Sequence, residues 1–175
     1  MTTPFDDTLA GFRLGQSETL LRLDGPDQFH QATHLLLTQT IRQLHIVTPD
    51  FEAERYNNAA FAEALSHFAR RSQYTETRIL VGDPGIAIRW GHQVVALARR
   101  LSSLIHIRRL HQDDFDPMES WIVADDMGLI RRDTMDGYQG LLSAKAIPQA
   151  QQKNRRFTEL WERGHEVPEF REFFI

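Results

Sequence analysis

The sequence contains no cysteine and no long apolar run, and each absence excludes a class of protein. Without cysteine the chain forms no disulfide and holds no thiolate nucleophile, so histidine and carboxylate side chains are the metal ligands that remain. No segment approaches the roughly 18 consecutive apolar residues that a membrane-spanning helix needs. Residues 1–7 lack the basic and apolar regions of a secretion signal. We therefore expect a cytoplasmic protein without a membrane span.

Excess positive charge is also absent. The chain carries 20 Lys and Arg against 24 Asp and Glu, which gives a formal net charge of -4. Domains that bind nucleic acid normally show a basic face or stripe, so we do not expect a nucleic-acid partner. The basic side chains are nevertheless uneven, with 7 in residues 1–87 and 13 in residues 88–175.

The length of 175 residues predicts a single domain over residues 1–175, since domains have about 150 residues on average. Hydrophobic residues make up 41% and charged residues 25%, as in ordinary folded proteins. Residues 1–18 show no periodicity and are expected to be an irregular N-terminal segment. Residues 165–175 form a C-terminal tail rich in aromatic side chains.

Apolar patterns along the chain predict strands that alternate with helices. Strands are expected at residues 20–23, 45–48, 77–81, 105–108 and 120–124. Amphipathic helices are expected at residues 28–43, 61–71, 88–101 and 149–163. Such alternation predicts an α/β fold with a mixed, mostly parallel β-sheet flanked by helices on both faces. Residues 125–128 predict a hairpin turn, and residues 137–148 predict a long loop.

No named catalytic motif follows any predicted strand. In an open α/β sheet the ligand crevice lies at the carboxyl ends of the strands. The loops that should hold a site are therefore those after Val47, Val81, Arg108 and Ala124. The sequence has no glycine-rich dinucleotide loop, P-loop, nucleophile elbow or HExxH motif, which removes the common enzyme classes that need them.

One segment, MESWIVADD at residues 118–126, resembles the motif region of the phospholipase D-like superfamily. That superfamily places the motif HxKxxxxD on a strand and the turn after it. Asp125 matches the acidic position, whereas Met118 stands at the position of the nucleophilic His and Ser120 at that of the phosphate-binding Lys. The similarity extends over roughly residues 17–135 and implies one half of a phospholipase D-like fold.

More closely, the chain looks like bacterial domains of this type that lack the motif and sometimes accompany acetyltransferase domains. In the superfamily an imidazole attacks phosphorus and a Lys neutralises the phosphoryl oxygens. A thioether at Met118 is no such nucleophile and a hydroxyl at Ser120 brings no charge. The resemblance therefore implies a scaffold without this chemistry and without a cofactor. Because members assemble two halves across an interface, it also implies a homodimer.

Four residues are candidates for a crevice that binds a phosphate-bearing ligand, namely His92, Arg108, Asp125 and Arg131. Arg131 follows the predicted hairpin, close to where the superfamily binds phosphate. The alternative is that the arginines pair with aspartates on the surface, where an ion pair contributes about 0–1 kcal/mol. Successive strand residues face opposite sides, so only one of Arg131 and Arg132 can point into the crevice.

The remaining titratable residues each have two interpretations. His92 lies near the start of a predicted helix. It is either a base or ligand group, or a structural residue held by hydrogen bonds. His111 and the aspartates at residues 113–116 resemble a metal cluster, but their spacing fits no calcium loop and favours a solvated acidic loop. Asp50 and Asp83 end strands, where Asp commonly makes turns. We predict no metal site.

These observations lead to three hypotheses. The first is a non-catalytic phospholipase D-like domain that acts as a binding or accessory module for a phosphate-bearing ligand or a protein partner. The second is a phosphoesterase that uses His92 or His111 with Asp83, either with or without a metal ion. The third is a structural homo-oligomer without a small-molecule ligand, in which residues 165–175 contribute to the interface.

Overall fold

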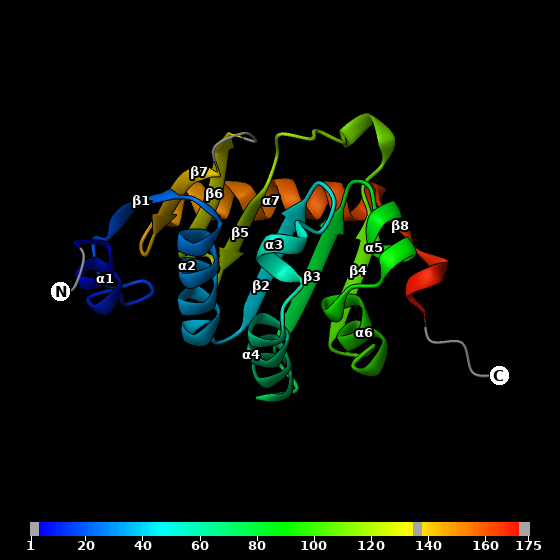
Figure 1. Ribbon diagram of the computed structural model, residues 1–175, viewed down its shortest axis with the longest axis horizontal. Helices are drawn as coiled ribbons and strands as arrows, with labels where there is room; N and C mark the ends of the chain where they lie inside the picture. The colour runs from blue at the N-terminus through cyan, green and yellow to red at the C-terminus, as the bar shows by residue number, and fades with distance from the viewer. Residues whose placement is uncertain (1–3, 135–137, 172–175) are drawn as a thin grey trace.

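One mixed sheet organises the computed structural model, which describes residues 4–134 and 138–171 (Figure 1). Its eight strands lie in the order β1-β7-β6-β5-β2-β3-β4-β8. The strands are β1 (Leu20–Asp24), β2 (Gln43–Thr48), β3 (Glu76–Val81), β4 (Ile105–Arg109), β5 (Trp121–Ala124), β6 (Gly128–Thr134), β7 (Gln139–Ser143) and β8 (His165–Glu166). The helices are α1 (Pro4–Ala10), α2 (Pro26–Gln39), α3 (Ala53–Tyr56), α4 (Ala59–Arg70), α5 (Gly85–Trp90), α6 (Gln93–Arg100) and α7 (Ile147–Arg163).

Parallel pairing is confined to β2, β3 and β4, which are joined through helices. The other pairs, β1 with β7, β2 with β5, β4 with β8, β5 with β6 and β6 with β7, are antiparallel. The predicted α/β class and mixed sheet are confirmed, but the prediction of a mostly parallel sheet is wrong. Few residues separate β5 from β6 and β6 from β7, and so short a connection can only join antiparallel neighbours.

Helices cover both faces of the sheet, as predicted. Figure 1 shows α2, α4 and α6 on one face and α7 alone on the other. Along β2, Leu44 and Ile46 belong to the core beneath α2 and α4, whereas Val47 belongs to the core beneath α7. Side chains alternate between the two faces of a strand, so a strand covered on both sides is apolar at nearly every position.

Two segments that the sequence predicts as irregular form regular elements. Pro4–Ala10 is the helix α1, within the expected irregular residues 1–18. Gln139–Ser143 is the strand β7, within the predicted loop 137–148. Its inward positions include Gly140, which offers no apolar side chain to reveal the alternation. A Cβ there would lie 2.0 Å from the Arg131 carbonyl oxygen, so the approach of β6 requires glycine. Residues 1–3 and 137 lie outside the described part of the chain.

Other boundaries agree more closely with the patterns. The hairpin predicted at residues 125–128 is confirmed, because Ala124 pairs with Gly128. The helix α2 ends at Gln39 and not at residue 43 as predicted, because β2 already begins at Gln43. In the tail, Phe170 is buried with its ring 5.8 Å from that of Phe51, and residues 172–175 lie outside the description.

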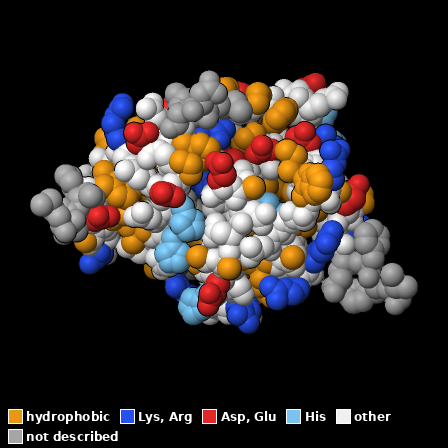
Figure 2. All heavy atoms as spheres, viewed as in Figure 1, with side chains coloured by type: hydrophobic (Ala, Val, Ile, Leu, Met, Phe, Trp, Pro, Cys, Tyr) orange, Lys and Arg blue, Asp and Glu red, His pale blue; other side chains and the backbone are white. Residues whose placement is uncertain are grey.

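Exposed basic side chains gather at the ends of helices. Figure 2 shows Lys and Arg side chains along the lower rim of this face, beneath α4 and α6. Arg70 lies in the last turn of α4, and Arg99 and Arg100 lie in that of α6. Positive charge there interacts favourably with the helix dipole. Among the described helices, none has both the length and the apolar character needed to cross a membrane.

Candidate functional site

The direction of β5 separates the residues that the sequence places in one crevice. β5 is antiparallel to β2, so the turn after Ala124 lies at the amino end of β2. Ser120, just before β5, lies instead at the carboxyl end of β2, where Val47 pairs with Trp121. The expectation that the loops after Val47 and Ala124 share one edge is therefore wrong.

Asp125 stabilises the start of β2. Its carboxylate accepts the backbone N–H groups of Ile41, Arg42 and Gln43 at 2.7, 2.8 and 2.9 Å. Asp125 itself has a φ of 53°, a left-handed conformation that Asp tolerates better than most residues. The Asp125 carboxylate is therefore occupied by hydrogen bonds to the backbone, and it lies at the edge of the sheet opposite Ser120.

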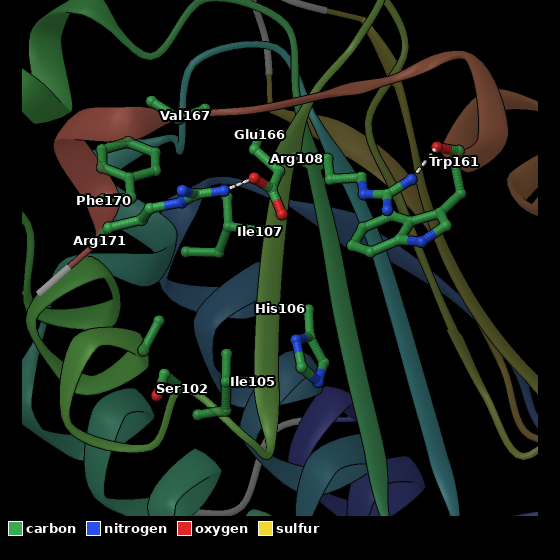
Figure 3. A pocket seen from close by; sticks show the side chains of 11 residues that line it. Ser102, Ile105, His106, Ile107, Arg108, Trp161, Glu166, Val167, Phe170 and Arg171 are labelled. Atoms are coloured by element: carbon green, nitrogen blue, oxygen red, sulfur yellow. Dashed lines mark hydrogen bonds and ion pairs between the residues drawn. The ribbon is translucent and has the colours of Figure 1, made fainter.

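Arg108 and Arg131 do not converge. Arg131 is exposed and pairs with Asp133 at 3.1 Å, which is the surface arrangement weighed as the alternative. Arg108 donates to the Trp161 carbonyl oxygen at 2.8 Å, and its guanidinium lies 4.6 Å from the Trp161 ring centroid (Figure 3). Three strands separate β6 from β4, which corresponds to roughly 19 Å at about 4.8 Å per strand spacing.

The pocket beside Arg108 has its own internal charge pairing. It has a volume of about 400 Å³ and opens at the edge of β4. Figure 3 shows Arg171 directed at Glu166, with which it forms an ion pair, and Phe170 beside them. Both arginines of this pocket thus have a partner within the chain, and the pocket is not our candidate site.

His92 is the N-cap of α6. Its Nδ1 accepts the Val94 N–H at 3.2 Å, which leaves Nε2 to donate to the Phe51 carbonyl oxygen at 3.1 Å. Burial lowers the pKa of His92, and the Phe51 carbonyl and the Asp50 carboxylate oppose this effect. Both ring nitrogens are therefore engaged, as the structural interpretation of this histidine requires.

The lowered pKa predicts how stability depends on pH. The unfolded chain takes up a proton at His92 below about pH 6.5 that the folded residue resists, so the free energy of unfolding falls as pH drops below that value. His92→Asn keeps an N-cap acceptor without the titration. We expect a flatter decline for this variant between about pH 6.5 and 5 in urea titrations. His45, whose pKa burial also lowers, leaves a residual slope. A slope identical to that of the wild type would contradict the prediction.

The residues of the phosphoesterase hypothesis serve local turns. The Asp83 carboxylate accepts the Gly85 N–H at 2.9 Å, and Asp50 accepts that of Glu52 at 2.9 Å. The turn interpretation of both aspartates is confirmed. His111 Nδ1 accepts the Asp113 N–H at 3.1 Å. Within residues 4–134 and 138–171 there is no group of three or more His, Asp or Glu that could hold a metal ion.

Charged side chains instead meet inside the protein at the carboxyl end of β2. The register of β2, β5 and β6 places Thr48, Ser120 and Arg132 side by side, and the Arg132 N–H donates to the Ser120 carbonyl oxygen at 2.9 Å. Glu52, the N-cap of α3, and Arg55 within α3 complete the group. We refer to these five residues as the buried arginine cluster.

The Glu52 carboxylate is the centre of this cluster. Its Oε1 accepts from Arg132 Nη1 at 2.5 Å. Its Oε2 accepts from the hydroxyl groups of Ser120 at 2.7 Å and Thr48 at 3.1 Å. Arg55 Nη1 lies 3.8 Å from Oε2 and donates to Ser120 Oγ at 3.2 Å. Two guanidinium groups therefore flank one carboxylate.

Several buried donors in the cluster remain without a partner. Among the described residues, no hydrogen-bond partner contacts Arg132 Nε, Arg132 Nη2 or Arg55 Nη2. Arg55 is 0% exposed and Arg132 is 8% exposed. An unpaired buried donor costs about 1–3 kcal/mol, and more when it is charged. Nε and Nη2 form one edge of the planar guanidinium, a fork that matches two oxygens of a carboxylate or phosphate.

Aromatic rings surround the two guanidinium groups without neutralising them. Arg55 lies 5.0 Å from the ring centroids of both Phe29 and Tyr56, and Arg132 lies 5.7 Å from that of Tyr138. Burial raises the pKa of Tyr138 to about 12 and raises that of Tyr56 as well. Both phenols are therefore neutral near pH 7, and the cluster keeps one excess positive charge.

Most of this cluster is not evident from the sequence. Arg131 is the residue expected to bind the ligand, although Arg132 is the member of that pair which faces inward. The alternation rule states that only one of the two can do so, but the choice requires knowing that Ile130 faces the core beneath α2. Glu52 and Arg55 lie in a stretch without apolar periodicity, so no sequence signal singles them out.

A family model described as "Domain of unknown function (DUF7931)" matches residues 25–173. No curated protein matches the chain.

Solved structures share the fold at low sequence identity. TrmBL2, an archaeal chromatin protein, is similar with a TM-score of 0.65 and 15% identity over 87% of this chain and 56% of that chain. Nuc from Salmonella typhimurium, a phospholipase D family member, has a TM-score of 0.63 and 10% identity over 88% of this chain and 99% of that chain. NucT from Helicobacter pylori has a TM-score of 0.62 and 10% identity over 85% and 99%. The chain thus spans little more than half of TrmBL2. The similarity to Nuc and NucT confirms the phospholipase D-like fold expected for this chain.

Proposed function

The chain belongs to the family described as a domain of unknown function, DUF7931, and we propose that it is a non-catalytic phospholipase D-like domain that binds a tetrahedral oxyanion in the buried arginine cluster. The observation that carries this proposal is the Nε and Nη2 fork of Arg132, which is buried without a partner in the described part of the chain. A phosphate-type group supplies the two acceptor oxygens that such a fork needs.

The composition of the cluster supports binding without phosphodiester cleavage. Ser120, at the position of the superfamily's Lys, donates to Glu52 and accepts from Arg55, so its hydroxyl is engaged on both sides. Met118, at the position of the superfamily's His, is 46% exposed and offers only a thioether. The cluster contains no imidazole that could form a covalent phosphoryl intermediate.

The residues proposed to contact the ligand differ from those expected from the sequence. Arg132 and Arg55 replace the pair expected from the sequence, Arg131 and Arg108, which have partners elsewhere. The guanidinium of Arg55 contacts the same Glu52 carboxylate as Arg132, so we assign it to the same binding site. Binding then offsets the cost of charged donors that are buried without acceptors.

Two adjacent arginines allow a matched test. Arg132→Lys keeps the charge but loses the planar fork, whereas Arg131→Lys makes the same change on the exposed side of β6. Thermal unfolding is measured with inorganic phosphate, sulfate or methyl sulfate, each against sodium chloride of equal ionic strength. A ligand at one hundred times its Kd stabilises by about 2.7 kcal/mol, or roughly 5 to 11 °C for a chain of this size. We expect this shift in the wild type and in Arg131→Lys, and its loss in Arg132→Lys.

Two results would overturn the proposal. One is that none of the three oxyanions stabilises the wild type beyond the chloride control. The other is a shift of equal size in Arg132→Lys, which would place the bound anion elsewhere on the protein. Titration calorimetry on the same three proteins supplies the affinities independently of unfolding.

A further inference from the structure

The buried arginine cluster carries a defined charge. Arg55 and Arg132 contribute two positive charges and Glu52 one negative charge, while Tyr56 and Tyr138 are neutral. The side chains of Arg55, Arg132 and Glu52 are 0%, 4% and 2% exposed, so water screens their charges little. A ligand that binds in the cluster therefore meets one net positive charge.

The backbone holds Glu52 in the cluster. Phe51 and Glu52 have φ values of 69° and 30°, both in the left-handed region that non-glycine residues seldom adopt. The Phe51 N–H donates to Thr48 Oγ1 at 3.1 Å, and the Phe51 ring lies 4.9 Å from that of His92. Such conformations cost about 1–3 kcal/mol each and persist only where the surroundings impose them. Moving Glu52 out would therefore disturb a buried aromatic contact as well.

From this geometry we infer that Glu52 makes the site selective for singly charged tetrahedral oxyanions over doubly charged ones, an inference that rests on the proposed function. With Glu52 in place, a singly charged ligand brings the buried group to neutrality. A doubly charged ligand leaves one unpaired negative charge beside the Glu52 carboxylate. Burying an unpaired charge is strongly unfavourable, and the close carboxylate adds repulsion.

The chemistry of the donors agrees with such a ligand. The Arg132 fork takes two oxygens, and Arg55 Nη2 is a further donor on the neighbouring guanidinium. A sulfate monoester, with one esterified oxygen, still presents three acceptor oxygens while carrying a single charge. Glu52 acts here as a specificity-determining residue, because it sets the charge that the ligand must match.

Sulfate and methyl sulfate provide the decisive pair of probes, since both are tetrahedral and fully ionised near pH 7 but carry two charges and one. Titration calorimetry at equal ionic strength measures both affinities for the wild type, Glu52→Gln and Glu54→Gln. Glu54 is an exposed acidic residue of α3 and serves as the matched control. We expect the wild type and Glu54→Gln to bind methyl sulfate at least about tenfold more tightly than sulfate, and Glu52→Gln to prefer sulfate.

The possible outcomes separate this inference from the proposed function. Equal affinities, or a preference for sulfate, in the wild type would overturn the selectivity while Arg132-dependent binding still stood. An unchanged preference in Glu52→Gln would also overturn it. If neither anion binds the wild type, the proposed function itself fails. The comparison of the two anions on the wild type decides the matter even if Glu52→Gln does not fold.

Discussion

Replacing Glu52 by alanine is expected to lower the free energy of unfolding by about 3–5 kcal/mol. The change removes the carboxylate that accepts from Arg132, Ser120 and Thr48, and it leaves two guanidinium groups buried without a counter-ion. Breaking a buried ion pair costs this much because the remaining charge stays out of water. Urea unfolding followed by circular dichroism measures the loss.

The surface pair on β6 provides the control for Glu52→Ala. Asp133 pairs with Arg131 at 3.1 Å, but both side chains are substantially exposed. Asp133→Ala is therefore expected to change the free energy of unfolding by no more than about 1 kcal/mol. A similarly small effect of Glu52→Ala would mean that water reaches the cluster and that its arginines do not require a counter-ion. Sulfate should restore part of the stability of Glu52→Ala, since two positive charges then match a doubly charged anion.

Phe157→Ala is expected to cost about 3–5 kcal/mol by a different mechanism, the loss of packing beneath α7. Phe157 is 0% exposed and is one of the α7 residues in the core between this helix and the sheet. Its ring stacks on His45 at 4.1 Å and lies 6.0 Å from the ring of Trp121. Figure 1 shows α7 alone on this face, so no neighbouring helix can move in to fill the cavity.

An exposed residue of α7 isolates the packing effect of Phe157→Ala. Glu159 lies two positions along the same helix and is exposed, with an ion pair to Arg156 at 3.6 Å. Glu159→Ala is expected to change stability by less than about 0.5 kcal/mol. Equilibrium urea unfolding of both variants tests the pair of predictions. A loss below about 2 kcal/mol for Phe157→Ala would show that the helix repacks on the sheet without this ring.

Local patterns in the sequence are sufficient for much of the architecture. Periodicity predicts the amphipathic helices α2 and α4 because each buries one stripe of side chains. The single helix predicted at residues 88–101 is instead divided into α5 and α6 at Gly91 and His92. The turn residues at 125–128 predict the hairpin, since its geometry depends on a few neighbouring residues. The resemblance at residues 118–126 predicts the phospholipase D-like fold that solved structures share, together with the substitutions at Met118 and Ser120.

The direction and neighbours of the strands are decided only in three dimensions. β7 pairs with β1 from the start of the chain and with β6 beside it in sequence. Its inward Gly140 contributes no apolar signal, although the backbone of Arg131 leaves no room for a side chain. The reversal of β5 moves Asp125 to the edge opposite Ser120. No local pattern encodes that reversal, because it depends on which strand β5 joins.

Local residue patterns are enough to identify the α/β fold class and the absence of the histidine and lysine of the motif that residues 118–126 resemble. Which charged residues meet depends instead on how the strands and helices pack in three dimensions. Arg132 rather than Arg131 faces inward because Ile130, two residues before it, belongs to the core beneath α2. Glu52 and Arg55 meet Arg132, about 80 residues away in sequence, because α3 follows the carboxyl end of β2, where β5 and β6 place Ser120 and Arg132 beside it. Ion pairs of this kind arise from long-range packing, which is why composition and spacing did not reveal them.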